Sequence, residues 1–335
     1  MANKKNTEYQ NDVNLTGFVF SANFRTGTSK ATSKWHPNEG YISGNLNVAT
    51  DEDAMNVVPV NFFVYENRNN KDGDPVPNET YQTLLQIMNG PTYETAGDKA
   101  PKVRISATVD TNDFYSSRTD DIVSAQRVNG RFIHLMSPGT NVTPANFDVN
   151  AVVTSAVERE VEGRDPYLDV RGYVFNYNGT RLFPVRFECQ DKSGQSFLLG
   201  LEPSSTNPVV MNLWGSIQTT VIEKIPAEQE EVANGFGVRP IISGNNVSTV
   251  RSWVITGADT GCVPEFGDVA PFTKNDMKRL IDERNVRLEE VKQSGMARAG
   301  KAAFNGTTVK KAPAQVFAQK TSASDIYDMD GDIPF

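Results

Sequence analysis

The sequence predicts a mainly β protein with two β-domains, a C-terminal helix and a disordered acidic tail. Short runs of alternating apolar and polar residues recur over most of the chain, one helical pattern follows them, and the last segment carries few apolar residues. At 335 residues the chain exceeds the roughly 250–300 residues at which one core stops growing, so two folded domains are expected. A hydrophobic fraction of 38% leaves part of that length for loops and tail.

Composition excludes several classes of protein. No run approaches the roughly eighteen apolar residues of a membrane span, and the first residues lack a signal peptide, so we expect a cytoplasmic protein with no membrane partner. The cysteines, Cys189 and Cys262, are too few for a disulfide framework and lack zinc-site spacing, so both are expected to be buried thiols. The net charge of -8 argues against binding through bulk positive charge, although basic residues gather between Arg25 and Lys34.

The first predicted domain spans residues 13–140 and follows a flexible N-terminus at 1–12. Strand patterns occur at 15–20, 41–50, 57–65, 103–107 and 131–136, and a short helical pattern occurs at 81–88. In the third strand, apolar residues on one side alternate with Asn61, Phe63 and Tyr65 on the other. Three strands, a helix and two more strands is the order of the OB fold, a five-stranded Greek-key barrel that binds oligonucleotides on one face.

The second predicted domain, 145–262, is again rich in strand-forming residues. Strands are expected at 149–153, 168–175, 182–189, 197–201, 209–221 and 247–256. The dipeptide Asn178-Gly179 is typical of a tight hairpin turn between two of them. A second OB-like barrel and another β-sandwich both fit this pattern, and we favour the barrel.

A helix is predicted at 273–293, and a disordered linker with an acidic tail at 294–335. Thr273 and Asp276 form the pattern of a capping box at the start of the helix, and apolar residues then recur at helical spacing. Beyond Gly295 the chain is rich in Ala, Lys, Thr, Ser and Gln, which we expect to be unable to bury enough surface to order itself.

The most specific motif is the acidic end of the chain, which closes on Ile-Pro-Phe. It resembles the C-terminal tip of bacterial single-stranded-DNA-binding proteins, and the resemblance extends more weakly to residues 45–50 of the first domain. A flexible acidic tip can bind a partner protein by placing its terminal phenyl ring in a pocket while its carboxylates face basic residues at the rim of that pocket. The resemblance implies that replication or recombination proteins bind the tip through Asp328, Asp330, Asp332, Ile333, Pro334 and Phe335.

The family usually has one OB domain and a Gly/Gln/Pro-rich linker, whereas this chain has two β-domains and a Lys-containing linker. Such a long version looks like a phage-encoded relative, which would act in the host cytoplasm. Because of this departure the tetramer typical of the bacterial proteins is not carried over, and a homo-oligomer stays an open alternative.

A DNA-binding site is predicted around the loop after the first strand, where OB folds grip their ligands. Single-stranded DNA is bound without sequence preference by stacking bases on aromatic rings while cations contact the phosphates. Both kinds of side chain occur here: Phe24, Arg25, Lys30, Lys34, Trp35 and Tyr41. The alternative is that Phe24 and Trp35 only close the end of the barrel.

A weaker candidate set lies in the second domain. Its aromatic residues are Tyr173, Phe175 and Tyr177, with Arg171 and Arg181 nearby. For Phe175 a position in the core is favoured.

No catalytic role, cofactor or metal is expected. Residues 295–301 fit a phosphate-binding loop, but Ala302 stands where a Ser or Thr is needed for magnesium. With only His36 and His134, the chain has neither an HExxH motif nor a paired metal cluster. The predicted function is therefore sequence-nonspecific binding of single-stranded DNA in replication, recombination and repair. A β-rich structural or assembly protein of a virion, with a partner-docking tail, is the alternative from another class, and RNA is the alternative ligand.

Overall fold

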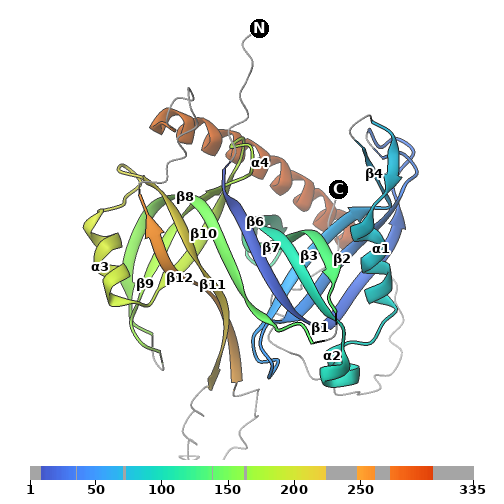
Figure 1. The fold of residues 1–335 in the computed structure, drawn as a ribbon. Coiled ribbons are helices and arrows are strands. Elements are labelled where there is room, and N and C mark those ends of the chain that lie inside the picture. Colours follow the sequence, from blue (N-terminus) through green and yellow to red (C-terminus); the bar gives the residue numbers. More distant parts are fainter. Residues whose placement is uncertain are drawn as a thin grey trace, which may run out of the picture.

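The computed structural model describes residues 9–34, 36–70, 73–137, 139–161, 164–223, 247–260 and 272–304. Ten strands of this part of the chain form one continuous sheet (Figure 1). They are β1 (Asn11–Thr28), β2 (Gly40–Ala49), β3 (Val57–Tyr65), β6 (Lys102–Ser116), β7 (Asp121–Leu135), β8 (Thr143–Arg159), β9 (Tyr167–Phe175), β10 (Leu182–Cys189), β11 (Val209–Glu223) and β12 (Val247–Asp259).

The remaining elements are short, apart from the last helix. They are the two-stranded ribbon β4 (Asn67–Asn69) and β5 (Pro75–Pro77), the helices α1 (Glu79–Met88), α2 (Tyr93–Ala96), α3 (Lys192–Gly200) and α4 (Lys274–Phe304), and a 3₁₀ turn at Gly97–Lys99. The predicted acidic tip and residues 305–335 lie outside the described residues, as do residues 1–8.

The sheet closes twice, once in each half of the chain. In the first half β1 pairs with β2, β2 with β3, β3 in parallel with β7, β7 with β6, and β6 with β1. In the second half β8, β9, β10, β12 and β11 pair in the same order, with a parallel pair at the same place, β10 with β12. In chain order the fourth strand of each set, β6 or β11, follows a helix, as in the OB fold. Both halves are therefore OB-like barrels, and the prediction of a mainly β protein is confirmed.

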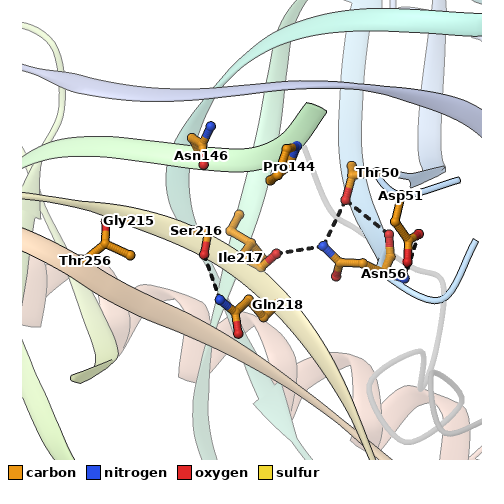
Figure 2. Close-up of a pocket in the computed structure, with 10 residues that line it drawn as sticks. All are labelled: Thr50, Asp51, Asn56, Pro144, Asn146, Gly215, Ser216, Ile217, Gln218 and Thr256. Atoms are coloured by element: carbon orange, nitrogen blue, oxygen red, sulfur yellow. Dashed lines mark hydrogen bonds between the residues drawn. The ribbon is translucent and has the colours of Figure 1, made fainter. Parts of the chain in front are cut away.

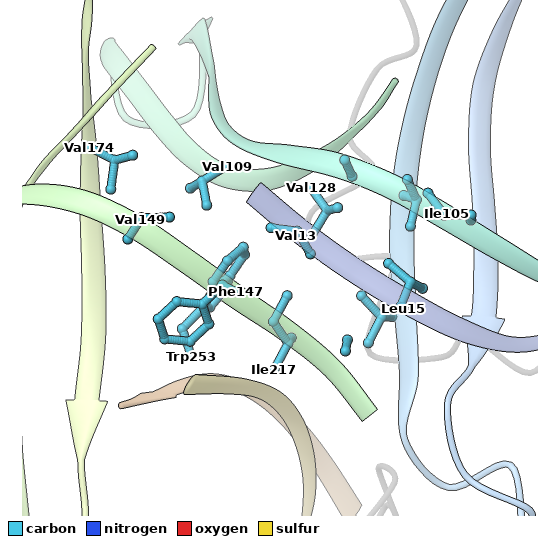
Figure 3. Close-up of a cluster of buried hydrophobic side chains, with 14 of the residues drawn as sticks. Val13, Leu15, Ile105, Val109, Val128, Phe147, Val149, Val174, Ile217 and Trp253 are labelled. Atoms are coloured by element: carbon cyan, nitrogen blue, oxygen red, sulfur yellow. The ribbon is translucent and has the colours of Figure 1, made fainter. Parts of the chain in front are cut away.

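The two barrels share a core. β1 pairs with β8 from Asn11 to Thr16, which joins the barrels edge to edge into the ten-stranded sheet. Figure 3 shows the buried side chains at this junction, where Val13 of β1 faces Phe147 of β8. One continuous hydrophobic cluster therefore extends through both predicted domains.

The helix α4 lies across both barrels in Figure 1. Its first turns bury Met277 and Leu280 against Phe175 of the second barrel. Farther along, the Arg284 guanidinium donates two hydrogen bonds, of 2.8 and 2.5 Å, to the carboxylate of Asp113 on β6 of the first barrel. The helix thus fixes the barrels relative to each other by an apolar contact at one end and an ion pair farther on.

Three sequence-based expectations differ from the structure. Residues 1–12 were expected to be a flexible N-terminus, but β1 begins at Asn11, whose buried side chain donates a 3.0 Å hydrogen bond to the Val109 carbonyl of β6. Residues 197–201 were expected to form a strand, but Phe197 to Gly200 end helix α3, whose N-cap Asp191 accepts a hydrogen bond from the backbone of Gly194. A short apolar run fits either element, and here only Leu198 is buried.

The last helix also continues to Phe304 instead of ending at 293. The segment from 294 to 304 contains four alanines together with Met296, Arg298 and Lys301, all of which are strong helix formers. Gly295 does not end the helix; a Cβ there would lie 2.3 Å from the side chain of Tyr115, so glycine allows the helix to pass close to β6.

Candidate nucleic-acid interface

The outer surface of β2 and β3 carries an aromatic cluster. Along β3, alternate residues from Val58 to Val64 point into the barrel, which leaves Phe63 and Tyr65 on the outside and partly exposed. Tyr41 of β2 is in register with Tyr65 of β3 and lies on the same side. We call Tyr41, Phe63 and Tyr65 the aromatic platform.

Phe63 packs against both other rings of the platform, whose centroids also lie 6.3 Å from each other. Its ring centroid is 5.2 Å from that of Tyr41 and 5.1 Å from that of Tyr65. His36, from the loop between β1 and β2, stacks on Tyr65 with centroids 3.9 Å apart and ring planes 13° apart. These four rings from two strands and one loop form a continuous aromatic surface on the first barrel.

Gly27 of β1 leaves space for the ring of Tyr41. The two residues face each other in the β1–β2 ladder, and a Cβ at Gly27 would lie 2.6 Å from the tyrosine ring. Glycine therefore lets the ring lie close to the β1 backbone.

Basic side chains lie beside the platform. Arg25 on β1 is exposed and pairs in register with Ser43, whose hydroxyl accepts a 3.3 Å hydrogen bond from the guanidinium Nε. Lys30 and Lys34 are exposed in the loop between β1 and β2. Ring faces and cations thus occur together on the barrel face and loop that OB folds use for oligonucleotides.

The loop that carries the lysines is held at its base by Glu39. Its backbone N–H donates to the Ser29 hydroxyl at 2.9 Å, and its carboxylate lies 2.6 Å from His36 Nδ1. The same carboxylate accepts a 2.7 Å hydrogen bond from the backbone of Asn67. These contacts keep His36 in place over Tyr65.

The structure divides the residues predicted for DNA binding into four groups. Arg25 and Tyr41 lie on the outer face, and Lys30 and Lys34 lie in the adjoining loop. Phe24 packs against the core, with its ring centroid 6.3 Å from that of Phe62, so it has the barrel-closing position. Trp35 lies outside the described residues.

Sequence reasoning did not select Phe63, Tyr65 or His36 for the site. The alternation in β3 already placed two of these rings opposite the apolar side, and large aromatic residues on the outer side of a strand were the available signal. The position of His36 depends on the fold of a loop, which carries no such periodicity.

In the second barrel, the weaker candidate set does not form a comparable platform. Phe175 is fully buried, with its ring 4.1 Å from Tyr9 and 4.9 Å from Phe272. Tyr173 packs against the same cluster under α4, whereas Tyr177 is exposed.

A shallow pocket of about 410 Å³ lies where the two barrels meet (Figure 2). Several of its polar groups are hydrogen-bonded within the protein. Asn56 donates to the Ile217 carbonyl of β11 at 3.0 Å, its side-chain oxygen accepts from the Thr219 backbone at 2.9 Å, and Asp51 accepts from the backbone of Met55 and Asn56. The pocket is therefore a hydrogen-bonded joint between the barrels and not the candidate site.

Other kinds of site find little support in the described ranges. There, no three or more His, Cys, Asp or Glu side chains group as metal ligands. Likewise, none of the helices in the described part of the chain combines the length and apolar character needed to cross a membrane. Cys189 is a buried free thiol whose pKa is raised by burial, and Cys262 lies outside the described residues.

No curated protein matches the chain. Among solved structures, it is similar to a deletion variant of the single-stranded DNA binding protein from Thermus aquaticus, with 11% identity and a TM-score of 0.41 over 64% of this chain and 88% of that one. The wild-type protein gives 11% identity and a TM-score of 0.39 over 64% and 87%. The model of the protein family described as YorF matches residues 10–294, and the chain therefore belongs to the YorF family.

Proposed function

We propose that the chain binds single-stranded DNA without sequence preference, through the aromatic platform and the basic residues beside it. The observation that carries the proposal is the meeting of Tyr41, Phe63 and Tyr65 on the outer face of β2 and β3. Stacking of one base on an aromatic side chain contributes about 1–3 kcal/mol. The platform has room for such contacts because its rings are only partly buried.

The polar side chains of this face favour nonspecific binding. Reading a base requires free donors and acceptors aimed at base edges, as in bidentate contacts of Asn or Gln with adenine. Here Asn47 donates to Ser21 at 2.9 Å, and Asn61 donates to the Val128 carbonyl at 3.3 Å. Both amide groups are engaged within the barrel, whereas ring faces accept any base.

The biological role that fits this activity is protection of single strands during replication, recombination and repair, in the host cytoplasm if the protein is encoded by a phage. Binding of this kind needs no chemistry at the site, so the proposed role is non-catalytic.

Recruitment of replication or recombination proteins by the acidic tip stays part of the proposal. It is supported by the sequence alone, since residues 328–335 lie outside the described residues. Pull-down with the full chain and with Phe335→Ala tests it, because loss of the ring should remove captured partners while DNA affinity stays unchanged. Identical captured proteins would contradict this role.

The binding proposal is tested by titrating the full chain into fluorescently labelled oligo(dT), a duplex of equal length and oligo(rU), at several salt concentrations. We expect the single strands to bind more tightly than the duplex. The slope of log K against log salt should be about -0.7 for each phosphate neutralised. Tighter binding of the duplex than of the single strands, or no detectable binding of all three nucleic acids, would reject the proposal. Tighter binding of oligo(rU) than of oligo(dT) would assign the site to RNA.

A further inference from the structure

We propose that an arginine cluster on the second barrel binds the phosphates of the same single strand, and that the face of this barrel equivalent to the aromatic platform does not stack bases on aromatic rings. The cluster consists of Arg159, Arg171 and Arg186 around the carboxylate of Asp169. The inference rests on the proposed function and adds a second contact region of different chemistry.

The cluster occupies the positions that correspond to the aromatic platform. In the second strand of each barrel, a glycine lies against the strand before it: a Cβ at Gly44 would be 2.0 Å from the Asn23 carbonyl oxygen, and one at Gly172 would be 2.1 Å from that of Val152. These two glycines mark equivalent points of the two barrels, and the strand registers can be compared from them.

In the first barrel, the residues one and three positions before the glycine are Ser43 and Tyr41, and they pair with Phe63 and Tyr65 of β3. In the second barrel, the corresponding pairs join β9 to β10. They are Arg171 with Arg186, and Asp169 with Glu188. Charged residues therefore replace every ring of the platform, and these positions offer bases no aromatic ring to stack on.

Asp169 organises the arginines. Its side chain is only 1% exposed, and its carboxylate accepts hydrogen bonds from Arg171 Nη2 at 2.8 Å and from Arg186 Nε at 2.6 Å. Arg159 Nε lies 3.6 Å from the same carboxylate. Burial acts to raise the pKa of Asp169, but the hydrogen bonds from Arg171 and Arg186 outweigh it and hold the pKa below its usual value.

The guanidinium groups remain available to a ligand. The side chains of Arg171 and Arg186 are each 52% exposed, and that of Arg159 is 49% exposed. Each guanidinium has five N–H donors, and Asp169 accepts from only some of them. The neighbouring carboxylate, that of Glu188, is paired with Arg164 at 2.6 Å, so the three arginines around Asp169 leave an excess of positive charge that a phosphate group would neutralise.

Contacts through β7 connect this cluster to the platform. Asn61, two residues before Phe63 on β3, donates to the Val128 carbonyl of β7, and Gln126 of β7 accepts a 2.8 Å hydrogen bond from the backbone N–H of Arg186. With strand residues spaced ~3.3 Å apart and neighbouring strands ~4.8 Å apart, the two regions are separated by a path on the order of 20 Å. A single DNA strand of moderate length can therefore contact both the aromatic platform and the arginine cluster.

The experiment compares labelled oligo(dT) of about 6 and about 30 nucleotides, since one OB fold occupies about 4–16 nucleotides. Arg159→Gln and Arg171→Gln each leave Asp169 its hydrogen bond from Arg186. On the long strand, each substitution should weaken binding and lower the steepness of the salt dependence by about 0.7. Arg171→Lys keeps the positive charge and should therefore keep the salt dependence of the unmodified protein. Binding of the short oligo(dT) should be unchanged in all of these variants.

Arg279→Gln is the matched control, because Arg279 on α4 is also half exposed and paired with a carboxylate, that of Glu283 at 2.9 Å. It should leave binding of both strands unchanged. An unchanged salt slope for Arg159→Gln and Arg171→Gln, in proteins with native melting temperatures, would overturn the inference. If Phe63→Leu still weakens binding in that case, the proposed function stands; if the unmodified chain binds neither strand, both fail.

Discussion

Replacing Phe63, which packs against both other rings of the platform, is the sharpest perturbation of the proposed site. The Phe63→Leu variant keeps most of the apolar volume on the outer face of β3 but removes the flat ring that contacts Tyr41 and Tyr65. We expect a small change in stability, because Phe63 is only partly buried and points away from the core.

The expected loss of affinity follows from the stacking energy. One stacked base contributes about 1–3 kcal/mol. Because each 1.4 kcal/mol changes an equilibrium constant about tenfold, the dissociation constant for oligo(dT) should rise about 5- to 150-fold. Phe63→Ala should fall at the upper end, since it also removes the side-chain packing that holds the two neighbouring tyrosine rings.

Fluorescence anisotropy with labelled oligo(dT) measures this change, and thermal unfolding of each variant confirms the fold. Phe132→Ala is the control: Phe132 is an exposed ring on β7 of the same barrel, outside the platform, and its removal should leave the affinity unchanged. Equal affinities of the unmodified protein and a folded Phe63→Leu variant would refute stacking on this face.

Three further predictions concern stability. Arg284→Met leaves Asp113 without its bidentate partner and should lower the free energy of unfolding by about 3 kcal/mol in urea titrations. A loss below about 0.5 kcal/mol would show that this ion pair does not fix α4. Asn56→Ala removes hydrogen bonds across the joint between the barrels and should cost about 1–3 kcal/mol in the same assay, and an unchanged unfolding curve would contradict that role. Asp169 has a lowered pKa in the folded protein, so its ionised form stabilises the fold above about pH 4, and this contribution is lost as the pH falls through the lowered pKa. The melting temperatures of the unmodified protein and Asp169→Asn should therefore differ at neutral pH and converge in acid, and a difference that grows in acid would contradict it.

The sequence predicted much of the first barrel. Alternation gave the inner and outer sides of β3, and the order of strands and helix indicated the OB fold before any pairing was known. It also favoured a core position for Phe175, which is fully buried.

The aromatic platform and the arginine cluster could be identified only from the structure, because both depend on the registers between paired β-strands. Tyr41 meets Tyr65 only through the pairing of β2 with β3, across a turn whose length the alternation does not determine. Asp169, Arg186 and Arg159 come from three different strands, and nothing in their local sequence indicates that they meet.

The shared core was also outside the reach of sequence reasoning. Length suggested two domains, and each half does close into its own barrel. The pairing of β1 with β8 joins these halves, and a contact between such distant segments leaves no periodic signal.

The most direct test of the central claim is photochemical cross-linking of the full chain to oligo(dT) in which single thymines are replaced by 5-iodouracil, with the linked residues identified by mass spectrometry. A base stacked on an aromatic ring is positioned to cross-link to it. The account predicts links to Tyr41, Phe63 or Tyr65, which decrease when unlabelled oligo(dT) competes. Links confined to the second barrel or to β6 and β7, with none on the platform, would contradict it.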